Sequence, residues 1–295
     1  MFLEEHLDGI DSGIKSIILN VAEKTKEIQK AFFTHNKLAG TKNVYNEEQL
    51  ELDKFADKII LSAMEESNAV KNFVSEEQSE IIQIVKCKGN YGVVVDPLDG
   101  ISCVKTNLAV GTILGVFDEG QVLEKGKKMD AAMYVLYGPQ TSLVYTAKKG
   151  VHEFVLSPKG RFVLRAEDIK IPEKGKIYGS GGFREDWSKK HLDLIEKLEK
   201  QKYKLRVSGC FTADFQQILT YGGLFSYPVT KTFPQGKLRL LFECNPIAFI
   251  AKNAGGDSTD GKQSILELKP EKISDRTPIY VGGKKEIELA EKLLK

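Results

Sequence analysis

The stretch Val93–Gly100, with the sequence VVVDPLDG, joins a buried-strand pattern to a pair of carboxylates. Three consecutive β-branched residues are typical of a fully buried strand. Asp96 and Asp99 follow at once, with Pro97 fixing the backbone between them and Gly100 allowing a sharp exit. Two acids at a rigid strand end can face one point, where a hard divalent cation would offset their repulsion. An ordinary turn is the alternative, since Asp, Pro and Gly are common turn residues.

A second acidic pair lies shortly upstream and favours a cation site over a simple turn. Glu76 and Glu77 follow the apolar segment Phe73–Ser75. Asp53 and Asp57 lie four residues apart on one face of a predicted helix, where a solvated face is the ordinary interpretation. So many acids gathered in one place would be unstable alone, but they are reasonable as oxygen ligands of bound cations.

The overall composition is that of an ordinary globular protein. The chain has 295 residues, of which 41% are hydrophobic and 28% charged, and its net charge is +2. This balance gives no reason to expect nucleic-acid or membrane binding. The four cysteines are scattered without a CxxC motif, and with only four histidines no zinc-binding spacing is present. No apolar run approaches the length of a membrane span, so we expect a reduced, cytoplasmic protein.

Hydrophobic periodicity predicts helices and strands in both halves of the chain, and therefore a layered α/β protein. A first helix is predicted from Asp11 or Ser12 and a second over Glu48–Ser67, with a loop at His35–Asn46 between them. Strands are predicted at residues 81–86, 91–95, 112–117, 131–137, 142–147, 151–156 and 161–164. Later elements are helices at 187–200, 212–221, 246–253 and 285–294 and a strand at 237–242. The charged segment 170–176 is the best candidate boundary.

The predicted strand at 237–242 carries a further acid to its end. By alternation Lys237, Arg239 and Glu243 would share one face of this strand. Asn245 and Pro246 would then cap and start the next helix, so that the turn between them holds Glu243 rigidly.

Several segments, in one order along the chain, resemble the class 1 fructose-1,6-bisphosphatase family, which includes the sedoheptulose-1,7-bisphosphatases. These segments are SEE at 75–77, VVDPLDG at 94–100, VGTILGV at 110–116, GKLRLLFECNP at 236–246 and AGG at 254–256. The resemblance implies the five-layered α-β-α-β-α fold of the sugar phosphatases. It also implies a metal-binding half over residues 1–170 and a sugar-phosphate-binding half over 171–295.

The resemblance further implies two or three Mg²⁺ ions, with Mn²⁺ as a possible substitute, in an oxygen cage. The implied metal ligands are the side chains of Glu76, Glu77, Asp96, Asp99 and Glu243 and the carbonyl of Leu98. Asp53 is expected to orient or deprotonate the attacking water, with Glu77 serving the third metal or the same water. Glu47 lies where the family has another catalytic acid.

Substrate contacts follow from the same resemblance. The backbone N–H groups of Gly100, Ile101 and Ser102 are expected to bind the scissile phosphate, although the family's usual Ser-Ser-Asn is Ile-Ser-Cys here. Lys237 and Tyr227 match residues that bind the second phosphate. Arg206 matches an arginine that the family donates across a subunit interface, which implies a homodimer or homotetramer. Each residue alone is also compatible with a surface charge or a packed aromatic ring.

The choice of sugar depends on residues 179–184, GSGGFR, which lack the Asn and Tyr that bind the distal phosphate in fructose bisphosphatases. The run is closer to the corresponding segment of sedoheptulose bisphosphatases. Arg184 and Arg206 would add charge for a more distant phosphate, while a flexible glycine loop is the alternative. The expectation is therefore hydrolysis of the 1-phosphate of sedoheptulose 1,7-bisphosphate to sedoheptulose 7-phosphate. A fructose-1,6-bisphosphatase or a dual-specificity enzyme is the alternative, followed by an inositol- or nucleotide-type phosphatase and an inactive regulatory relative.

Overall fold

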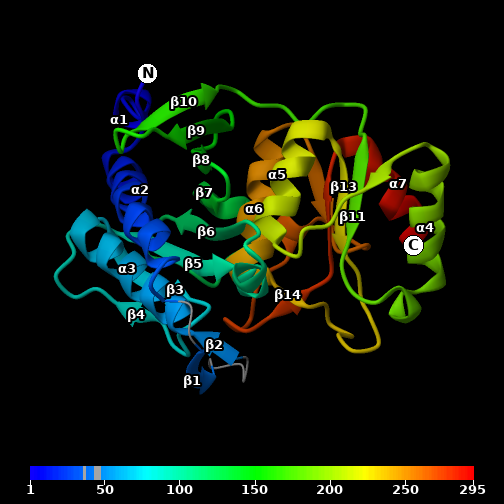
Figure 1. The fold of residues 1–295 in the computed structure, drawn as a ribbon, viewed down its shortest axis with the longest axis horizontal. Coiled ribbons are helices and arrows are strands. Elements are labelled where there is room, and N and C mark those ends of the chain that lie inside the picture. The colour runs from blue at the N-terminus through cyan, green and yellow to red at the C-terminus, as the bar shows by residue number, and fades with distance from the viewer. Residues whose placement is uncertain (36–37, 43–47) are drawn as a thin grey trace.

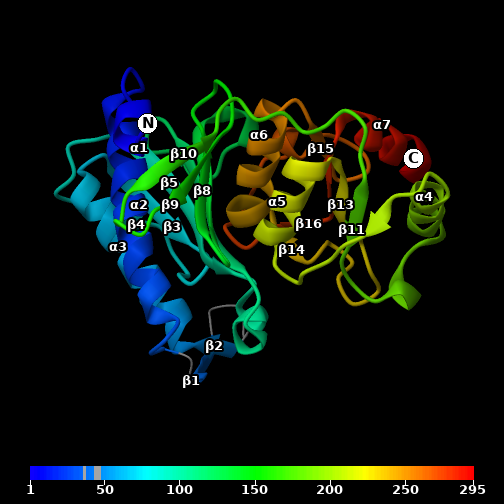
Figure 2. The same cartoon turned by 45° about the horizontal axis from the view of Figure 1, so that its top comes forward.

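The computed structural model describes residues 1–35, 38–42 and 48–295, and the side chains of all of these except 38–42 and 48–50. In this part of the chain two main β-sheets alternate with three helix layers (Figure 1 and Figure 2). Helices α2 (Ser12–Ala31) and α3 (Glu51–Ser67) cover the outer face of the first sheet. Helices α5 (Phe211–Tyr221) and α6 (Asn245–Asn253) lie between the sheets, and α4 (Lys189–Lys200) and α7 (Lys284–Leu294) cover the second sheet. The expected α-β-α-β-α architecture is confirmed.

The first sheet has eight strands in the order β10-β9-β8-β7-β6-β5-β3-β4. Their bounds are β3 (Val70–Ser75), β4 (Ile82–Gln83), β5 (Tyr91–Asp99), β6 (Val110–Phe117), β7 (Met129–Tyr137), β8 (Thr141–Thr146), β9 (His152–Leu156) and β10 (Phe162–Ala166). Only the pair β3 and β5 is parallel within this sheet of the described chain.

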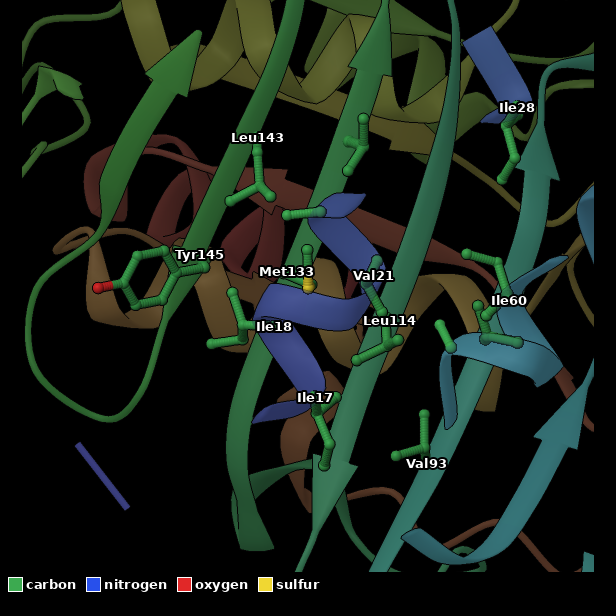
Figure 3. Close-up of a cluster of buried hydrophobic side chains, with 14 of the residues drawn as sticks. Ile17, Ile18, Val21, Ile28, Ile60, Val93, Leu114, Met133, Leu143 and Tyr145 are labelled. Atoms are coloured by element: carbon green, nitrogen blue, oxygen red, sulfur yellow. The ribbon is translucent and has the colours of Figure 1, made fainter. Parts of the chain in front are cut away.

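Helices cover both faces of this sheet, so neighbouring residues of one strand enter different cores. In β5, Val93 and Val95 pack in the core under α2 and α3, whereas Val94 packs in the core that contains α5 and α6. Figure 3 shows Val93 together with Ile17 of α2 and Ile60 of α3. The uninterrupted VVV run is therefore buried throughout, as the sequence predicts.

The second sheet has five strands in the order β12-β11-β13-β17-β15. Their bounds are β11 (Ile177–Ser180), β12 (Lys204–Leu205), β13 (Gly223–Tyr227), β15 (Asp257–Thr259) and β17 (Ile279–Gly282). Smaller elements are helix α1 (Leu3–His6), the pair β1 (Leu38–Lys42) and β2 (Glu48–Leu50), the pair β14 (Leu238–Arg239) and β16 (Arg276–Thr277), and a 3-10 helix at Ile101–Thr106. None of the helices in the described residues combines the length and the apolar character that a bilayer crossing requires.

The predicted helices are found with small shifts. Asp11 caps α2 by accepting hydrogen bonds from the N–H groups of Gly13 and Ile14, at 2.8 and 3.1 Å. The second helix begins at Glu51 and not at Glu48, because the preceding residues form β2, and β1 lies within the predicted loop.

The predicted strands are confirmed in the first sheet except that 81–86 contains only the two-residue β4. The strand predicted at 237–242 is confirmed only at its start, where β14 covers Leu238–Arg239. The chain leaves β14 after Arg239 and forms a wide helical turn over Leu240–Cys244, which continues directly into α6. Leu240, Leu241 and Phe242 are all buried between the sheets, and an apolar run without alternation does not distinguish a strand from a helix. The predicted Asn245 cap is also wrong, because Asn245 is the first residue of α6 and not its cap.

Helix α4 joins the second sheet through a buried histidine. His191 is fully buried, with Nε2 2.9 Å from the Ser180 hydroxyl and Nδ1 3.2 Å from the Tyr280 hydroxyl. Burial lowers the pKa of this imidazole from 6.5 to about 4, with the positive charge of Arg184 adding to the effect. His191 is therefore neutral in the folded protein at physiological pH.

This histidine makes the stability of the fold depend on pH. Between pH 6.5 and 4 this histidine is protonated in the unfolded chain but not in the native protein, so the free energy of unfolding falls as the pH falls. We expect this group alone to remove about 3 kcal/mol between pH 7 and pH 4. Urea denaturation at both pH values should show a smaller loss in His191→Gln than in the wild type. An equal loss in the two proteins would contradict the assignment, and His35→Gln is the matched control.

Candidate active site

The parallel pairing of β3 and β5 brings two acidic segments to the same end of the sheet. Ser75 lies opposite Val95 in the register, and the N–H of Glu76 donates to the carbonyl of Val95 at 3.0 Å. The pairing of β3 with β5 therefore ends at Ser75 and Val95, and Glu76 leaves the sheet next to Asp96. The predicted convergence of the two acidic pairs has this simple geometric cause.

The Asp96–Asp99 segment forms a tight, well-anchored corner. Asp96 accepts a hydrogen bond from the N–H of Leu98 at 3.0 Å, and the register against β6 shifts between Asp96 and Asp99. Gly100 then adopts φ +84°, and a β-carbon added there would lie 2.6 Å from that of Cys210. Only glycine fits this position without strain. The predicted sharp exit is confirmed.

Asp99 is held by the start of helix α5. Its carboxylate accepts from the N–H of Thr212 at 2.6 Å and from that of Phe211 at 3.2 Å. Peptide N–H groups at a helix start are otherwise unpaired, so the Asp99 carboxylate supplies two of them with an acceptor. The second half of the chain thus fixes an acid that the first half supplies.

Glu243 completes a group of three buried carboxylates. Its side chain accepts from the N–H of Arg239 at 2.6 Å across the wide helical turn. One oxygen each of Asp96, Asp99 and Glu243 lies within 4.8 Å of the others. Burial, followed by the charge of Glu76, raises the pKa of Asp96 well above its usual range and that of Glu243 to about 8. Buried carboxylates this close together repel one another when ionised, and a bound hard divalent cation would offset that repulsion.

Arg239 forms a buried ion pair with Glu76 beside this group. The Arg239 side chain is 4% exposed and that of Glu76 is 13% exposed. The guanidinium opposes the rise in the Glu243 pKa. Positive charge is therefore built into the acidic corner by the chain itself.

A cavity of about 990 Å³ opens from the carboxylates toward the second sheet. Its lining includes Lys237, whose amino group lies 5.5 Å from the centre of the Tyr227 ring, and Arg276, whose guanidinium donates to the carbonyl of Lys237. Gly181 and Gly182 line the same cavity. Carboxylates and cations line the same cavity, which suits a substrate that carries phosphate groups.

Most of the predicted site residues line this cavity. Those that do so are Asp53, Glu76, Glu77, Asp96, Leu98, Asp99, Gly100, Ile101, Ser102, Tyr227, Lys237 and Glu243. Asp53 is 5% exposed and its neighbour Asp57 is 6% exposed, so the solvated-face interpretation is wrong for both. Asp57 instead accepts from the Gln78 amide at 2.5 Å.

Two predicted arginines lie elsewhere, and one predicted acid is not described. Arg184 is exposed, with its guanidinium 5.8 Å from the Trp187 ring, and it lines a separate hollow. Arg206 is also exposed, 5.1 Å from the centre of the Tyr221 ring, and is not among the residues that line the cavity. Glu47 lies outside the described residues.

The sequence predictions missed three ionisable residues of the cavity: Arg239 as a partner of Glu76, Arg276, and Asp214. Burial raises the pKa of Asp214 to about 6, although its carboxylate accepts from the Ser208 N–H at 2.7 Å. Arg239 lies inside a segment that the sequence analysis singled out, so its charge was a usable signal. Arg276 reaches the site only through the pairing of β14 with β16, and its surrounding sequence gives no indication of this.

Comparison with known families assigns both halves of the chain. Residues 6–167 match the fructose-1-6-bisphosphatase N-terminal domain, and residues 171–295 match the fructose-1-6-bisphosphatase C-terminal domain. A class 1 fructose-1,6-bisphosphatase from Methanocorpusculum labreanum is 44% identical over 284 residues, which cover 96% of this chain and 88% of that protein. One from Methanospirillum hungatei is 41% identical over 298 residues, covering 100% of this chain and 96% of that protein.

Solved structures agree with these matches. The fructose-1,6-bisphosphatase of Leishmania major in its holo form superposes with a TM-score of 0.93 at 29% sequence identity, covering 99% of this chain and 98% of that one. The T-state structure of the same enzyme superposes with a TM-score of 0.89 over the same coverage.

Proposed function

The chain belongs to the fructose-1,6-bisphosphatase family and is a phosphatase that hydrolyses a phosphomonoester of a sugar bisphosphate, and from this premise we propose that it releases the 1-phosphate of fructose 1,6-bisphosphate with Mg²⁺ as its metal. The observation that carries the proposal is the meeting of Asp96, Asp99 and Glu243 within 4.8 Å. These acids line a cavity that Lys237 and Arg276 also line.

Asp96, Asp99 and Glu243 would hold the metal, and Glu76, Glu77 and the Leu98 carbonyl are the further candidate ligands in the cavity. Bound Mg²⁺ supplies positive charge to the phosphoryl oxygens and lowers the pKa of a coordinated water. Asp53 and Glu77 line the same cavity, where they can orient the attacking water or accept its proton. The segment Gly100–Ser102 begins a 3-10 helix, so its N–H groups can bind the scissile phosphate.

Lys237, Tyr227 and Arg276 would bind the second phosphate. In our proposal Arg206 acts from a second copy of the chain, in a homodimer or homotetramer, which agrees with its exposure outside the cavity of its own subunit. Residues 1–170 would then supply the metal-binding half and residues 171–295 the half that binds the sugar phosphate. The four free cysteines support a reducing cytoplasmic setting.

The fructose ester is a better proposal than the sedoheptulose ester that residues 179–184 favour. The curated relatives described above are named for fructose 1,6-bisphosphate. The sequence predicts that Arg184 binds the more distant phosphate of the sedoheptulose ester, but Arg184 is exposed and lines a different hollow. The glycines at 181 and 182 do line the cavity, and they keep the larger sugar as a second candidate.

The deciding experiment measures kcat/KM for both bisphosphates with one preparation at one Mg²⁺ concentration. We expect the fructose ester to be preferred at least tenfold, and fructose 1-phosphate to be a poor substrate because it lacks the group that Lys237 binds. Lys237→Met should raise KM for the bisphosphate more than it lowers kcat. A tenfold preference for the sedoheptulose ester would reverse the choice of sugar, and no phosphate release from either ester would overturn the proposed function.

A further inference from the structure

Two histidines and a glutamate form a second cluster of metal-binding side chains, remote in sequence from the active-site acids. His6 ends helix α1, His152 begins β9, and Glu167 directly follows β10. One nitrogen of each imidazole and one carboxylate oxygen lie within 4.8 Å of one another. The chain folds its N-terminal helix against the β9–β10 hairpin, where Phe2 pairs with Val163, and this brings the three side chains together.

The spacing of the cluster is close to that of a tetrahedral metal site. Zinc binds histidine nitrogen and carboxylate oxygen at about 2.0–2.1 Å, which separates two tetrahedral ligands by about 3.3 Å. Nε2 of His6 and the nearer oxygen of Glu167 are 3.3 Å apart. One nitrogen of His152 lies within 4.8 Å of both of these atoms, and the ring centre of His152 lies 4.4 Å from that of His6.

The hydrogen bonds of the two imidazoles also suit coordination. Nδ1 of His6 lies 2.6 Å from the hydroxyl of Tyr145, so a metal can replace the proton on Nε2 while Nδ1–H donates to Tyr145. His152 has two long hydrogen bonds, 3.2 Å from Nε2 to the Lys149 carbonyl and 3.3 Å from the N–H of Asp168 to Nδ1. Exchanging one of them for a metal bond costs little.

The cluster faces an open, acidic cavity. The three side chains line a hollow of about 810 Å³, so a bound ion would keep a position for water or another ligand. Asp11, Asp118 and Asp130 line the same hollow, and Lys148, which also lines it, pairs with Asp130. Carboxylates outnumber lysines around it, and the field favours a cation.

We propose that His6, His152 and Glu167 form a second metal site, selective for a zinc-class divalent transition metal, which fastens the N-terminal helix to the β9–β10 hairpin. Imidazole nitrogen distinguishes this site from the active site, where the candidate ligands are all oxygens that suit Mg²⁺. The two sites would therefore hold different metals in the same protein.

Zn²⁺ titration by calorimetry tests this in full-length protein with Mg²⁺ at saturation. The wild type should bind one more Zn²⁺ per chain than Glu167→Gln or His6→Gln. Tyr145→Phe, which removes only the hydrogen bond to His6, should weaken that Zn²⁺ about tenfold. His35→Gln is the matched control and should bind like the wild type, since His35 stacks on Phe55 far along the chain from the cluster.

A second readout separates this site from zinc bound by the active-site carboxylates. The ring ¹⁵N signals of the four histidines should respond selectively, with His6 and His152 shifting on Zn²⁺ addition and His35 and His191 unchanged. Equal Zn²⁺ stoichiometry in the wild type and Glu167→Gln, or unshifted His6 and His152 signals, would overturn the proposal. Neither readout depends on activity, so this result is independent of the proposed function.

Discussion

Glu243→Gln is expected to lower kcat/KM by about three orders of magnitude, or about 4 kcal/mol of transition-state stabilisation. Gln keeps the shape of the side chain and can still accept from the N–H of Arg239, but it replaces an anionic metal ligand with a neutral amide. Asp96→Asn should have a similar effect, because Asp96 and Glu243 belong to the same group of buried carboxylates. Steady-state phosphate release across a Mg²⁺ series is the measurement.

The same variant is expected to stabilise the metal-free protein. Burial and the charge of Glu76 raise the Glu243 pKa to about 8, whereas an unfolded glutamate titrates near 4.5. Between these pH values the native state keeps a proton that the unfolded chain has released, so stability falls as the pH rises through this window. At pH 7 this costs on the order of 3 kcal/mol, and Gln, which does not ionise, avoids the cost.

Urea denaturation in EDTA at pH 5 and pH 7.5 therefore complements the kinetics. Metal-free Glu243→Gln should be more stable than the wild type at pH 7.5 and nearly equal to it at pH 5. Loss of activity in a more stable protein excludes unfolding as its cause. Glu271→Gln, at an exposed position, is the control for both assays. Undiminished turnover in Glu243→Gln would remove this residue from the metal site.

The parts of the site that the sequence predicts are those fixed by local pattern. Two apolar strands each run into acids. When these strands pair in parallel with Ser75 opposite Val95, Glu76 comes to lie beside Asp96. The left-handed conformation at Gly100 follows from the same short motif. Local sequence preferences and the overall fold agree at this corner, so the sequence alone is sufficient to predict it.

The parts that the sequence does not predict depend on pairing between distant segments. Leu240–Phe242 is an apolar run without a period, and packing between two sheets, not local preference, makes it helical. Arg276 reaches the cavity through the pairing of two strands of two residues each, which are too short to be predicted from a sequence pattern. Arg184 shows the opposite error, because a matching motif position does not determine which hollow an exposed side chain lines.

Arg239→Met is the second substitution with a large expected effect. The Arg239 guanidinium pairs with Glu76 and lowers the Glu243 pKa, so its loss leaves a cluster of buried carboxylates without the positive charge that the chain provides. Removing one partner of a buried ion pair typically costs about 3–5 kcal/mol, and we expect a loss of this size in the metal-free protein. Mg²⁺ should recover part of it, because the bound cation replaces the missing charge.

A double-mutant cycle tests this explanation. If the penalty comes from the uncompensated charge of Glu76, adding Glu76→Gln to Arg239→Met should remove that charge. The double variant should then regain at least half of the stability that Arg239→Met alone loses. Urea denaturation of all four proteins, with EDTA and with Mg²⁺, measures the coupling. Additive losses would mean that Arg239 stabilises the fold through the packing of its buried side chain, and that the acids do not depend on its charge.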